Sequence, residues 1–166
     1  MERAIKAVRS NKVAPCIDKM TVNEIDEYFK SHMNEVKTSI KSKKYKPLPV
    51  RRVYIPKPNG KERPLGIPAV RDRVIQQSVV QALSAVYDEH FSEHSYGFRP
   101  NRSTHGAINE ALCYLNEGYE WVVDLDIEKF FDKVNHDKLI SIIRERIKDD
   151  VTLNLLRKIL QAGVMD

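Results

Sequence analysis

The chain has 166 residues, of which 42% are apolar and 31% are charged, a composition typical of one globular domain with its own core. It contains no apolar run near the length of about 20 residues that a membrane span requires, and its N-terminus is too charged for a secretion signal. We therefore expect an intracellular, cytoplasmic protein with no membrane partner, whose two cysteines, Cys16 and Cys113, are reduced and structural.

The positive charge of the chain is concentrated in one segment. Residues 37–63 contain ten lysines and arginines against a single acid, Glu62, so this basic segment carries +9. The whole chain carries +5, and the remaining residues therefore sum to −4. Such asymmetry indicates a face that binds a polyanion, with a solvated lysine-rich loop as the alternative.

Two helices are expected before the basic segment. The first is short and covers residues 2–10. The second is expected to run from the capping pair Thr21 and Glu24 to about Ser42, because apolar residues recur there at helical spacing. These apolar residues are Val22, Ile25, Phe29, Met33, Val36 and Ile40. The stripe predicts a helix packed against the core.

A β-hairpin is expected next. Prolines at positions 47 and 49 end the helical pattern, and Val53 and Ile55 then alternate with polar residues. Asn59-Gly60 supplies a tight turn, and residues 62–67 form the returning strand. The hairpin therefore carries the second half of the basic segment.

Four more helices and one strand complete the predicted elements. The first of these helices covers residues 70–91, and its polar start either follows a template strand or is simply solvated. The other helices begin or end at Ser103 or Thr104, Gly118, Asn135, and Asp149 or Asp150. Together with the hairpin, this order predicts an α+β fold.

The remaining predicted strand ends in two acidic residues. The β-favouring run Trp121–Val123 leads to Asp124 and Asp126, which predicts a buried strand with carboxylates at its end. Side chains alternate along a strand, so the two acids share one wet face. Two neighbouring carboxylates repel each other and suit a divalent cation such as Mg²⁺. Solvated acids at a strand end are the alternative.

The residues after these acids resemble a known family. Asp126-Ile127 followed by Phe130-Phe131-Asp132 resembles the first catalytic motif of reverse transcriptases, and Asn135-His136 resembles the group II intron branch. The resemblance implies that Asp126 is the catalytic, metal-binding aspartate and that the Ile127 carbonyl lies against the second of two Mg²⁺ ions. Phe131 would lie under the nucleotide sugar and exclude a 2′-hydroxyl. No role is implied for Asp124.

The hairpin resembles the fingers motif of the same family. Residues 51–68, RRVYIPKPNGKERPLGIP, match it closely. In that family a lysine and an arginine hold the triphosphate of the incoming nucleotide, which implies this role for Lys57 and Arg63. Leu65 would lie near the templating base.

Two further stretches resemble segments of intron-type enzymes. Residues 12–22, KVAPCIDKMTV, are similar to the segment before the fingers, but Cys16 and Lys19 stand where glycines are common. Residues 95–108, SYGFRPNRSTHGAI, resemble another intron-type motif, in which Arg99 and Arg102 are candidates for phosphate or structural carboxylate contacts. The residues expected to bind RNA are Lys41, Lys43, Lys44, Lys46, Arg51, Arg52, Lys61, Leu65 and Arg99.

The resemblance covers almost the whole chain and implies the fingers and incomplete palm of a right-hand polymerase, with an N-terminal helical extension. Residues 1–85 would form the extension and fingers, 86–136 the first part of the palm, and 137–166 fingers helices that lead to a truncated end. The second aspartate motif of the family does not occur before Asp166. We therefore expect a fragment that binds RNA but is inactive alone.

The implied parent is an RNA-directed DNA polymerase that uses Mg²⁺, an RNA template such as a group II intron, a DNA primer and dNTPs. An intron-encoded parent would also assist splicing as a maturase and take part in retrohoming. The alternatives are an RNA-binding module without catalysis, a retron or diversity-generating reverse transcriptase, and an enzyme that makes only RNA. The cognate RNA and the oligomeric state, including a homodimer, stay open.

Overall fold

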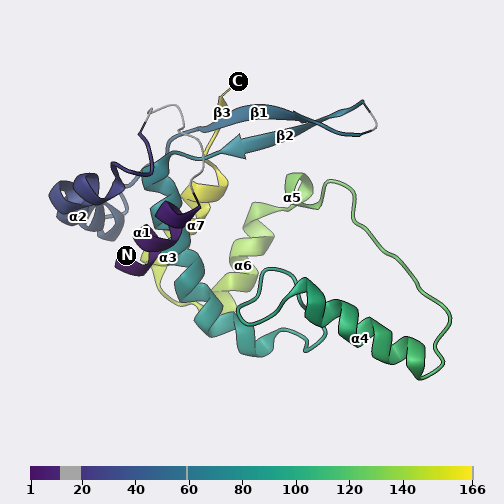
Figure 1. Cartoon of the computed structure of the whole chain (residues 1–166). Coiled ribbons are helices and arrows are strands. Elements are labelled where there is room, and N and C mark those ends of the chain that lie inside the picture. The colour runs from purple at the N-terminus through teal and green to yellow at the C-terminus, as the bar shows by residue number, and fades with distance from the viewer. Residues whose placement is uncertain (12–19, 59, 166) are drawn as a thin grey trace. The chain divides into compact units, whose positions relative to one another are not determined.

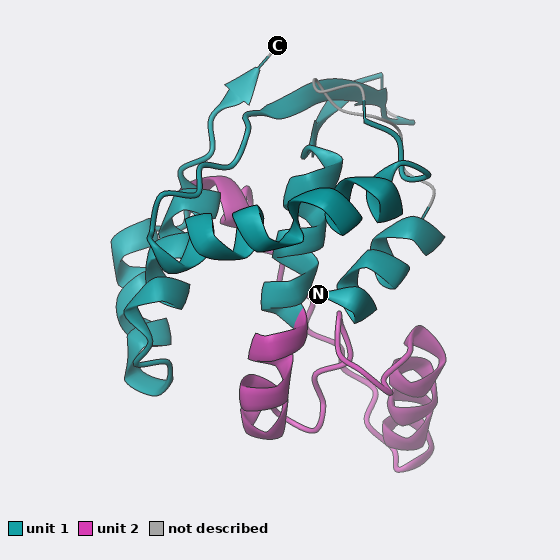
Figure 2. Cartoon of the chain, turned by 90° about the vertical axis from the view of Figure 1, so that its left-hand side faces the viewer, with its two compact units in different colours: residues 1–80, 134–166 teal, residues 81–133 magenta. Residues whose placement is uncertain are grey.

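The computed structural model describes residues 1–11, 20–58 and 60–165. They form two compact units (Figure 2), of which unit 1 comprises residues 1–80 and 134–166 and unit 2 residues 81–133. Residues 12–19, which hold most of the segment that resembles the pre-fingers region, lie outside the described residues, as does Asn59 of the predicted turn.

The elements mix helices with one small sheet, which confirms the α+β prediction (Figure 1). Unit 1 contains α1 (Glu2–Ser10), α2 (Ile25–Lys41), β1 (Val50–Pro56), β2 (Glu62–Ile67), the first part of α3 (Val70–Tyr87), α6 (His136–Arg146), α7 (Asp150–Leu160) and β3 (Val164–Met165). Unit 2 contains the end of α3, a 3₁₀ turn (Asp88–His90), α4 (Thr104–Asn116) and α5 (Phe130–Lys133). Within the described ranges, no helix has the length and apolar character to cross a membrane.

The core of unit 1 lies between α1, α2, α3 and α7. The apolar stripe predicted for α2 is confirmed, since Ile25, Phe29 and Val36 are buried in this core and its other members pack against it. The remaining buried residues of the cluster are Ala4, Ile5, Val8, Tyr45, Val70, Val74, Ile75 and Leu155. Burial of these side chains is the main favourable term for the fold of unit 1.

The sheet has the order β2-β1-β3. β1 and β2 form the predicted antiparallel hairpin, with Arg51 opposite Ile67 and Pro56 opposite Glu62. At the turn the Lys57 N–H donates to the Lys61 carbonyl over 2.7 Å. Gly60 has a φ of 75°, a conformation that glycine adopts at little cost. Figure 1 shows the hairpin projecting from the helices of unit 1.

A third strand, which the sequence did not predict, supports the base of the hairpin. β3 runs parallel to β1 and pairs Val164 with Val50 and Met165 with Arg51. The Val50 N–H also donates to the Gly163 carbonyl over 2.9 Å. Two residues are too few for an alternating pattern to be recognised in the sequence.

A buried carboxylate fixes the chain between α2 and β1. Asp72 on α3 is only 1% exposed. It accepts a hydrogen bond from the Tyr45 hydroxyl, and its other oxygen accepts one from the Leu48 N–H over 2.8 Å. Burial and this carboxylate raise the pKa of the Tyr45 phenol, so the hydroxyl keeps its proton and donates. Lys158 on α7 donates to the carbonyls of Tyr45, over 3.0 Å, and of Lys43.

The predicted helix ends are largely confirmed. Ser103 caps α4 by accepting from the Gly106 N–H, and Asn135 caps α6 by accepting from the Lys138 N–H. Asp149 caps α7, and Gly118 follows α4 with a φ of 96°. The capping pair of α2 differs from the prediction, because Glu24 accepts from Thr21 over 2.7 Å while the helix itself begins only at Ile25.

The predicted buried strand at Trp121–Val123 is wrong. Residues 119–127 are not assigned to a strand, and Trp121, Val122 and Val123 are 93%, 82% and 81% exposed. A strand needs a neighbouring strand for its backbone groups and a layer for its side chains. Unit 2, every residue of which is described, supplies neither of them, and none of its residues is buried.

The Asp72 network yields a prediction about stability. Asp72→Ala removes the acceptor of the buried Tyr45 hydroxyl, at about 1–3 kcal/mol, and that of the partly buried Leu48 N–H, at about 1 kcal/mol. We therefore expect the free energy of unfolding to fall by about 2–4 kcal/mol in urea titrations. The matched control Asp26→Ala breaks an exposed ion pair with Arg9 and should cost less than about 1 kcal/mol. Equal losses in the two variants would contradict the anchoring role.

Candidate functional site

The hairpin presents cations at an exposed tip. Lys57 follows β1 directly, Arg63 lies in β2 opposite Ile55, and both side chains are exposed. Arg63, Leu65 and Ile67 share one face of β2 because side chains alternate along a strand. Ile67 is buried at the base of this face, whereas Leu65 is 42% exposed. The face therefore leads from the core, past exposed aliphatic side chains, to the cations at the tip.

The first part of the basic segment lies at the end of α2 and in the loop after it. Lys41, Lys43, Lys44 and Lys46 are exposed, whereas Tyr45 among them is buried. The Tyr45 anchor to Asp72 therefore fixes the backbone from which these lysines extend. Arg51, Arg52 and Lys61 belong to the hairpin, and all of these predicted RNA-binding residues lie in unit 1.

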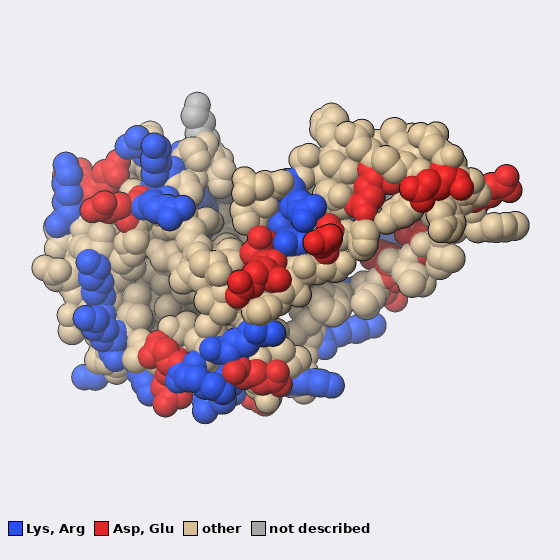
Figure 3. Space-filling view, turned by 90° about the horizontal axis from the view of Figure 1, so that it is seen from below, with Lys and Arg blue, Asp and Glu red and all other residues tan. Residues whose placement is uncertain are grey.

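Not every face of the molecule carries a surplus of cations. On the face that Figure 3 shows, acidic and basic side chains are interspersed. A polyanion requires a surface on which positive charge is not cancelled locally. The net +9 of residues 37–63 makes this segment the strongest candidate for such a surface.

The acids of the predicted catalytic motif lie in unit 2. Asp124, Asp126 and Ile127 are exposed in the extended segment that precedes α5, and Ile127 is 69% exposed. Phe131 lies on α5, is 86% exposed, and forms an edge contact with Phe130 at a centroid distance of 5.4 Å. The helical turn α5 was not predicted. Phe131 and the acids therefore lie on one short stretch of unit 2, separate in sequence from the hairpin cations of unit 1.

The donor atoms of this stretch are of the type that Mg²⁺ prefers. Carboxylate and carbonyl oxygens are hard ligands, and Mg²⁺ in nucleotide sites is commonly held by one or two carboxylates together with substrate phosphates. Among residues 1–11, 20–58 and 60–165, no three His, Cys, Asp or Glu side chains lie close enough to hold a metal ion together. The carboxylates of Asp124 and Asp126 are thus of the type that suits a magnesium site completed by phosphate oxygens.

Arg99 has a structural role in this fold. Its side chain is only 9% exposed, and Nε donates to Asp88 Oδ1 over 2.8 Å. The other guanidinium nitrogens donate to the carbonyls of Asp88, Ser92 and Ser95 over 2.7–3.2 Å. The Arg99 guanidinium also holds the pKa of the Asp88 carboxyl below its usual range. Of the two roles that the sequence left open, these contacts favour the carboxylate contact, and RNA binding by Arg99 stays a prediction.

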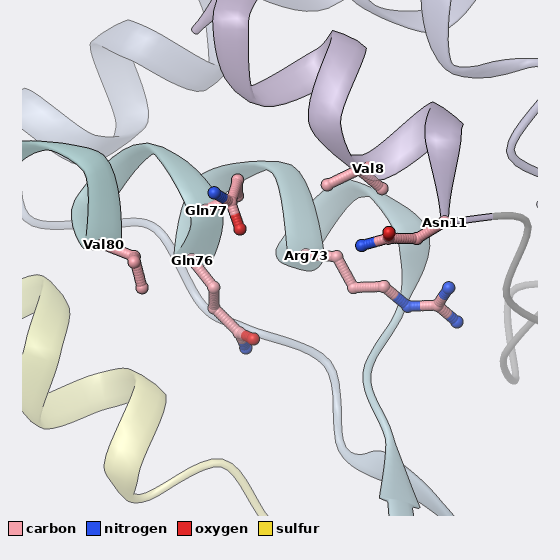
Figure 4. A pocket seen from close by; sticks show the side chains of 6 residues that line it. All are labelled: Val8, Asn11, Arg73, Gln76, Gln77 and Val80. Carbon is pink, nitrogen blue, oxygen red and sulfur yellow. The ribbon is translucent and has the colours of Figure 1, made fainter. Parts of the chain in front are cut away.

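The polar start of α3 lines a hollow beside α1 (Figure 4). This hollow has a volume of about 260 Å³ and is lined by Val8, Asn11, Arg73, Gln76, Gln77 and Val80. The Nε atom of Arg73 donates to the Pro68 carbonyl over 2.8 Å, so part of this side chain supports the start of the helix. The described residues that line the hollow offer amide groups and the Arg73 guanidinium, which suit hydrogen bonding to a polar group.

The chain is similar to one protein family and to several individual proteins. Residues 55–164 match the family model described as reverse transcriptase (RNA-dependent DNA polymerase). Protein YkfC of Escherichia coli is 38% identical over all of this chain and 45% of its own length. The group II intron-encoded protein LtrA of Lactococcus lactis is 39% identical over 85% of this chain and 24% of its own length. A putative COX1/OXI3 intron 2 protein of Saccharomyces cerevisiae is 39% identical over 82% of this chain and 16% of its own length. The chain thus spans less than half the length of these relatives.

Arg99 yields the prediction of this subsection. Arg99→Ala should raise hydrogen exchange of the amides between residues 88 and 103 by about tenfold or more, because several hydrogen bonds that hold this loop are lost together. The control Glu93→Ala removes an exposed charged side chain of the same loop and should leave that exchange pattern unchanged. If Arg99→Ala left hydrogen exchange unchanged but weakened RNA binding, the main role of Arg99 would be to bind phosphate.

Proposed function

We propose, from the fact that the chain belongs to the reverse transcriptase family, that the whole protein is an RNA-directed DNA polymerase of the group II intron type. The observation that carries the proposal is the match to the family over residues 55–164. This range includes the exposed hairpin tip and the acidic stretch, residues 124–127. In this proposal residues 1–85 are the N-terminal extension and fingers of a right-hand polymerase. Residues 86–136 begin the palm, and residues 137–166 are fingers helices.

The hairpin cations hold the incoming dNTP. Lys57 and Arg63 are exposed on a β-ribbon whose base is tied to the core, so their charges are presented on a firm support. A guanidinium and an ammonium bind phosphate oxygens through charge-assisted hydrogen bonds. As negative charge develops on the leaving pyrophosphate, the same contacts become stronger and lower the barrier.

The acidic stretch holds the metal ions. Asp126 and the carbonyl of Ile127 would bind two Mg²⁺ ions, and Asp124 adds negative charge beside them. When bound, these ions lower the pKa of the attacking 3′-hydroxyl and neutralise the pyrophosphate. The exposure of both residues leaves room for the phosphate oxygens that complete the coordination.

Phe131 selects the sugar. Its ring is exposed on α5, five positions after Asp126, where a bulky side chain can lie against the sugar of a bound nucleotide. A ring in that position excludes a 2′-hydroxyl by its volume. The product would therefore be DNA, which separates this proposal from an enzyme that makes only RNA.

The RNA partner is bound by the basic segment. The exposed lysines at the end of α2, together with Arg51, Arg52 and Lys61, suit the phosphates of an RNA template. Leu65 lies exposed on the hairpin and would face the templating base. Similarity to an intron-encoded relative supports group II intron RNA as this partner, with roles in intron splicing and retrohoming. A DNA primer and a homodimer belong to the same proposal.

A second candidate function is an RNA-binding module without catalysis. Unit 2 has no buried residue, and the described residues hold no cluster of metal ligands, both of which fit a chain that binds without reacting. Retron and diversity-generating enzymes are the alternatives within the family. Measurements of primer extension by the complete protein distinguish an RNA-binding module from a polymerase.

Nucleotide addition is expected to respond differently to the two sets of residues. In the complete protein, Asp126→Asn should reduce primer extension below detection but leave RNA affinity unchanged, because a metal ligand is lost and the basic segment is intact. Lys57→Ala and Arg63→Ala should each raise the dNTP KM and lower kcat, with kcat/KM falling about 10- to 100-fold. The control Lys30→Ala removes an exposed cation outside the basic segment. Normal extension by Asp126→Asn would refute the polymerase assignment.

RNA binding by the 166-residue chain is expected to depend steeply on salt. If half of the ten cations in the basic segment, residues 37–63, contact phosphates, log K should fall with log salt with a slope of about −3.5 to −4.5. Replacing Lys43, Lys44 and Lys46 with Gln should flatten the slope by about 2. The control replaces Lys30, Lys129 and Lys148, three exposed lysines outside the segment, with the same loss of charge. Equal effects of the two triple variants in fluorescence anisotropy would show that the segment is only a solvated loop.

A further inference from the structure

Phe98 is held in a conformation that is unfavourable for its side chain. Its φ is 58°, in the left-handed region, which bulky residues rarely adopt and which costs about 1–3 kcal/mol. The side chain gains nothing from packing, since Phe98 is fully exposed at 111% of the reference accessibility. Glycine would adopt this backbone without strain. A residue that is both strained and unpacked points to a role outside the folding of its own loop.

The loop that presents Phe98 is firmly held. Arg99, the next residue, ties it to the 3₁₀ turn through Asp88 and to the chain at Ser92 and Ser95. The Arg99 guanidinium also lies 5.5 Å from the centroid of the Phe91 ring. These contacts over-determine the backbone and can sustain the strain at Phe98. The ring is thus presented on a fixed support.

The surroundings of Phe98 are polar and cationic. Residues 95–109 contain two arginines and one histidine, and the acid that follows them, Glu110, contacts His94 and Tyr114. Asp88 binds Arg99 directly. Arg102 is exposed and lies 5.4 Å from the centroid of the Tyr96 ring, and the Glu110 carboxylate interacts with the same tyrosine. Asn101, also exposed, adds an amide. An aromatic ring among a cation and an amide matches the pattern that binds single-stranded nucleic acid, in which rings stack on bases and cations meet phosphates.

We propose that Phe98 is a stacking platform for an unpaired base of single-stranded RNA, with Arg102 on an adjacent phosphate. The proposal rests on the RNA-binding function proposed above and adds a contact in unit 2, outside the basic segment. A base is favoured over an apolar protein segment because the residues that flank Phe98 in the sequence, Gly97, Arg99, Pro100 and Asn101, include a cation and an amide and contain proline as their one apolar side chain. A ring that is already fixed loses little freedom when a base stacks on it.

The test uses the 166-residue chain and a single-stranded RNA dodecamer that carries 2-aminopurine in its middle. The wild type should quench the fluorophore on binding, because stacking against an aromatic ring has that effect. Phe98→Ala should abolish the quenching and weaken binding about 5- to 100-fold, the usual range for loss of one stacked base. Phe98→Trp should restore both signals. Phe98→Leu, which keeps apolar bulk without a π-face, should not.

A matched control removes another exposed aromatic of the same unit. Tyr119 is 64% exposed, and Tyr119→Ala should change RNA affinity less than twofold. A second variant tests the strain directly: Phe98→Gly should weaken RNA binding as Phe98→Ala does, without lowering the melting temperature. A fall of several degrees would assign Phe98 to packing and overturn the proposal.

The outcomes separate this inference from the function on which it rests. Wild-type binding with a steep salt slope but without quenching, and with Phe98→Ala unchanged in affinity, would overturn the stacking platform and leave the basic segment intact. Rescue by Leu as complete as by Trp would mean that Phe98 docks on an apolar protein surface, and would also overturn it. Failure of the wild type to bind any RNA would overturn both proposals.

Discussion

The buried carboxylate of Asp72 determines where the hairpin leaves the core of unit 1. It lies in the first turn of α3, where the helix dipole favours negative charge, and it accepts hydrogen bonds from Tyr45 and Leu48. A buried carboxylate without such partners would be strongly unfavourable. Lys158 of α7 holds the same loop by its carbonyls, and β3 pairs with the next residues. Three distant parts of the sequence thus meet at the base of the ribbon that carries Lys57 and Arg63.

Much of this architecture could be predicted from the sequence, because it depends on local signals. The stripe of α2 is a periodic pattern, Ser103, Asn135 and Asp149 are capping side chains, and the hairpin is marked by its turn. The Asp72 network could not be predicted in this way. Asp72 stands between two arginines in the sequence, a pattern that predicts a solvated residue. No local pattern indicates its partner Tyr45, which lies 27 positions away. The strand β3 and the turn α5 are too short to show a period.

The residues of the candidate site also differ in whether local signals in the sequence could predict their surroundings. The exposure of Lys57, Arg63 and the lysines after α2 follows from their charge. The surroundings of Arg99 could not be predicted in this way. Its charge suggested a phosphate contact, whereas its guanidinium donates to Asp88 and to three carbonyls. Phe98 was missed because an aromatic residue in a sequence is normally taken for core. Only the sign of φ and the full exposure of the ring distinguish it.

The acidic stretch shows why strand propensity alone does not make a strand. Val122, Val123 and Leu125 favour extended backbone, and residues 119–127 are indeed without helix, yet they form no ladder in unit 2. Chemistry at a metal centre requires ligands held within about 0.5 Å, which an unpaired segment does not provide. If Asp126 binds a metal ion as proposed, the segment must gain a neighbour to hold it in place, whether another strand, bound nucleic acid or substrate. Because its backbone is not helical, pairing breaks no helical hydrogen bonds, and the exposed apolar side chains around Asp126 favour burial by whatever covers them.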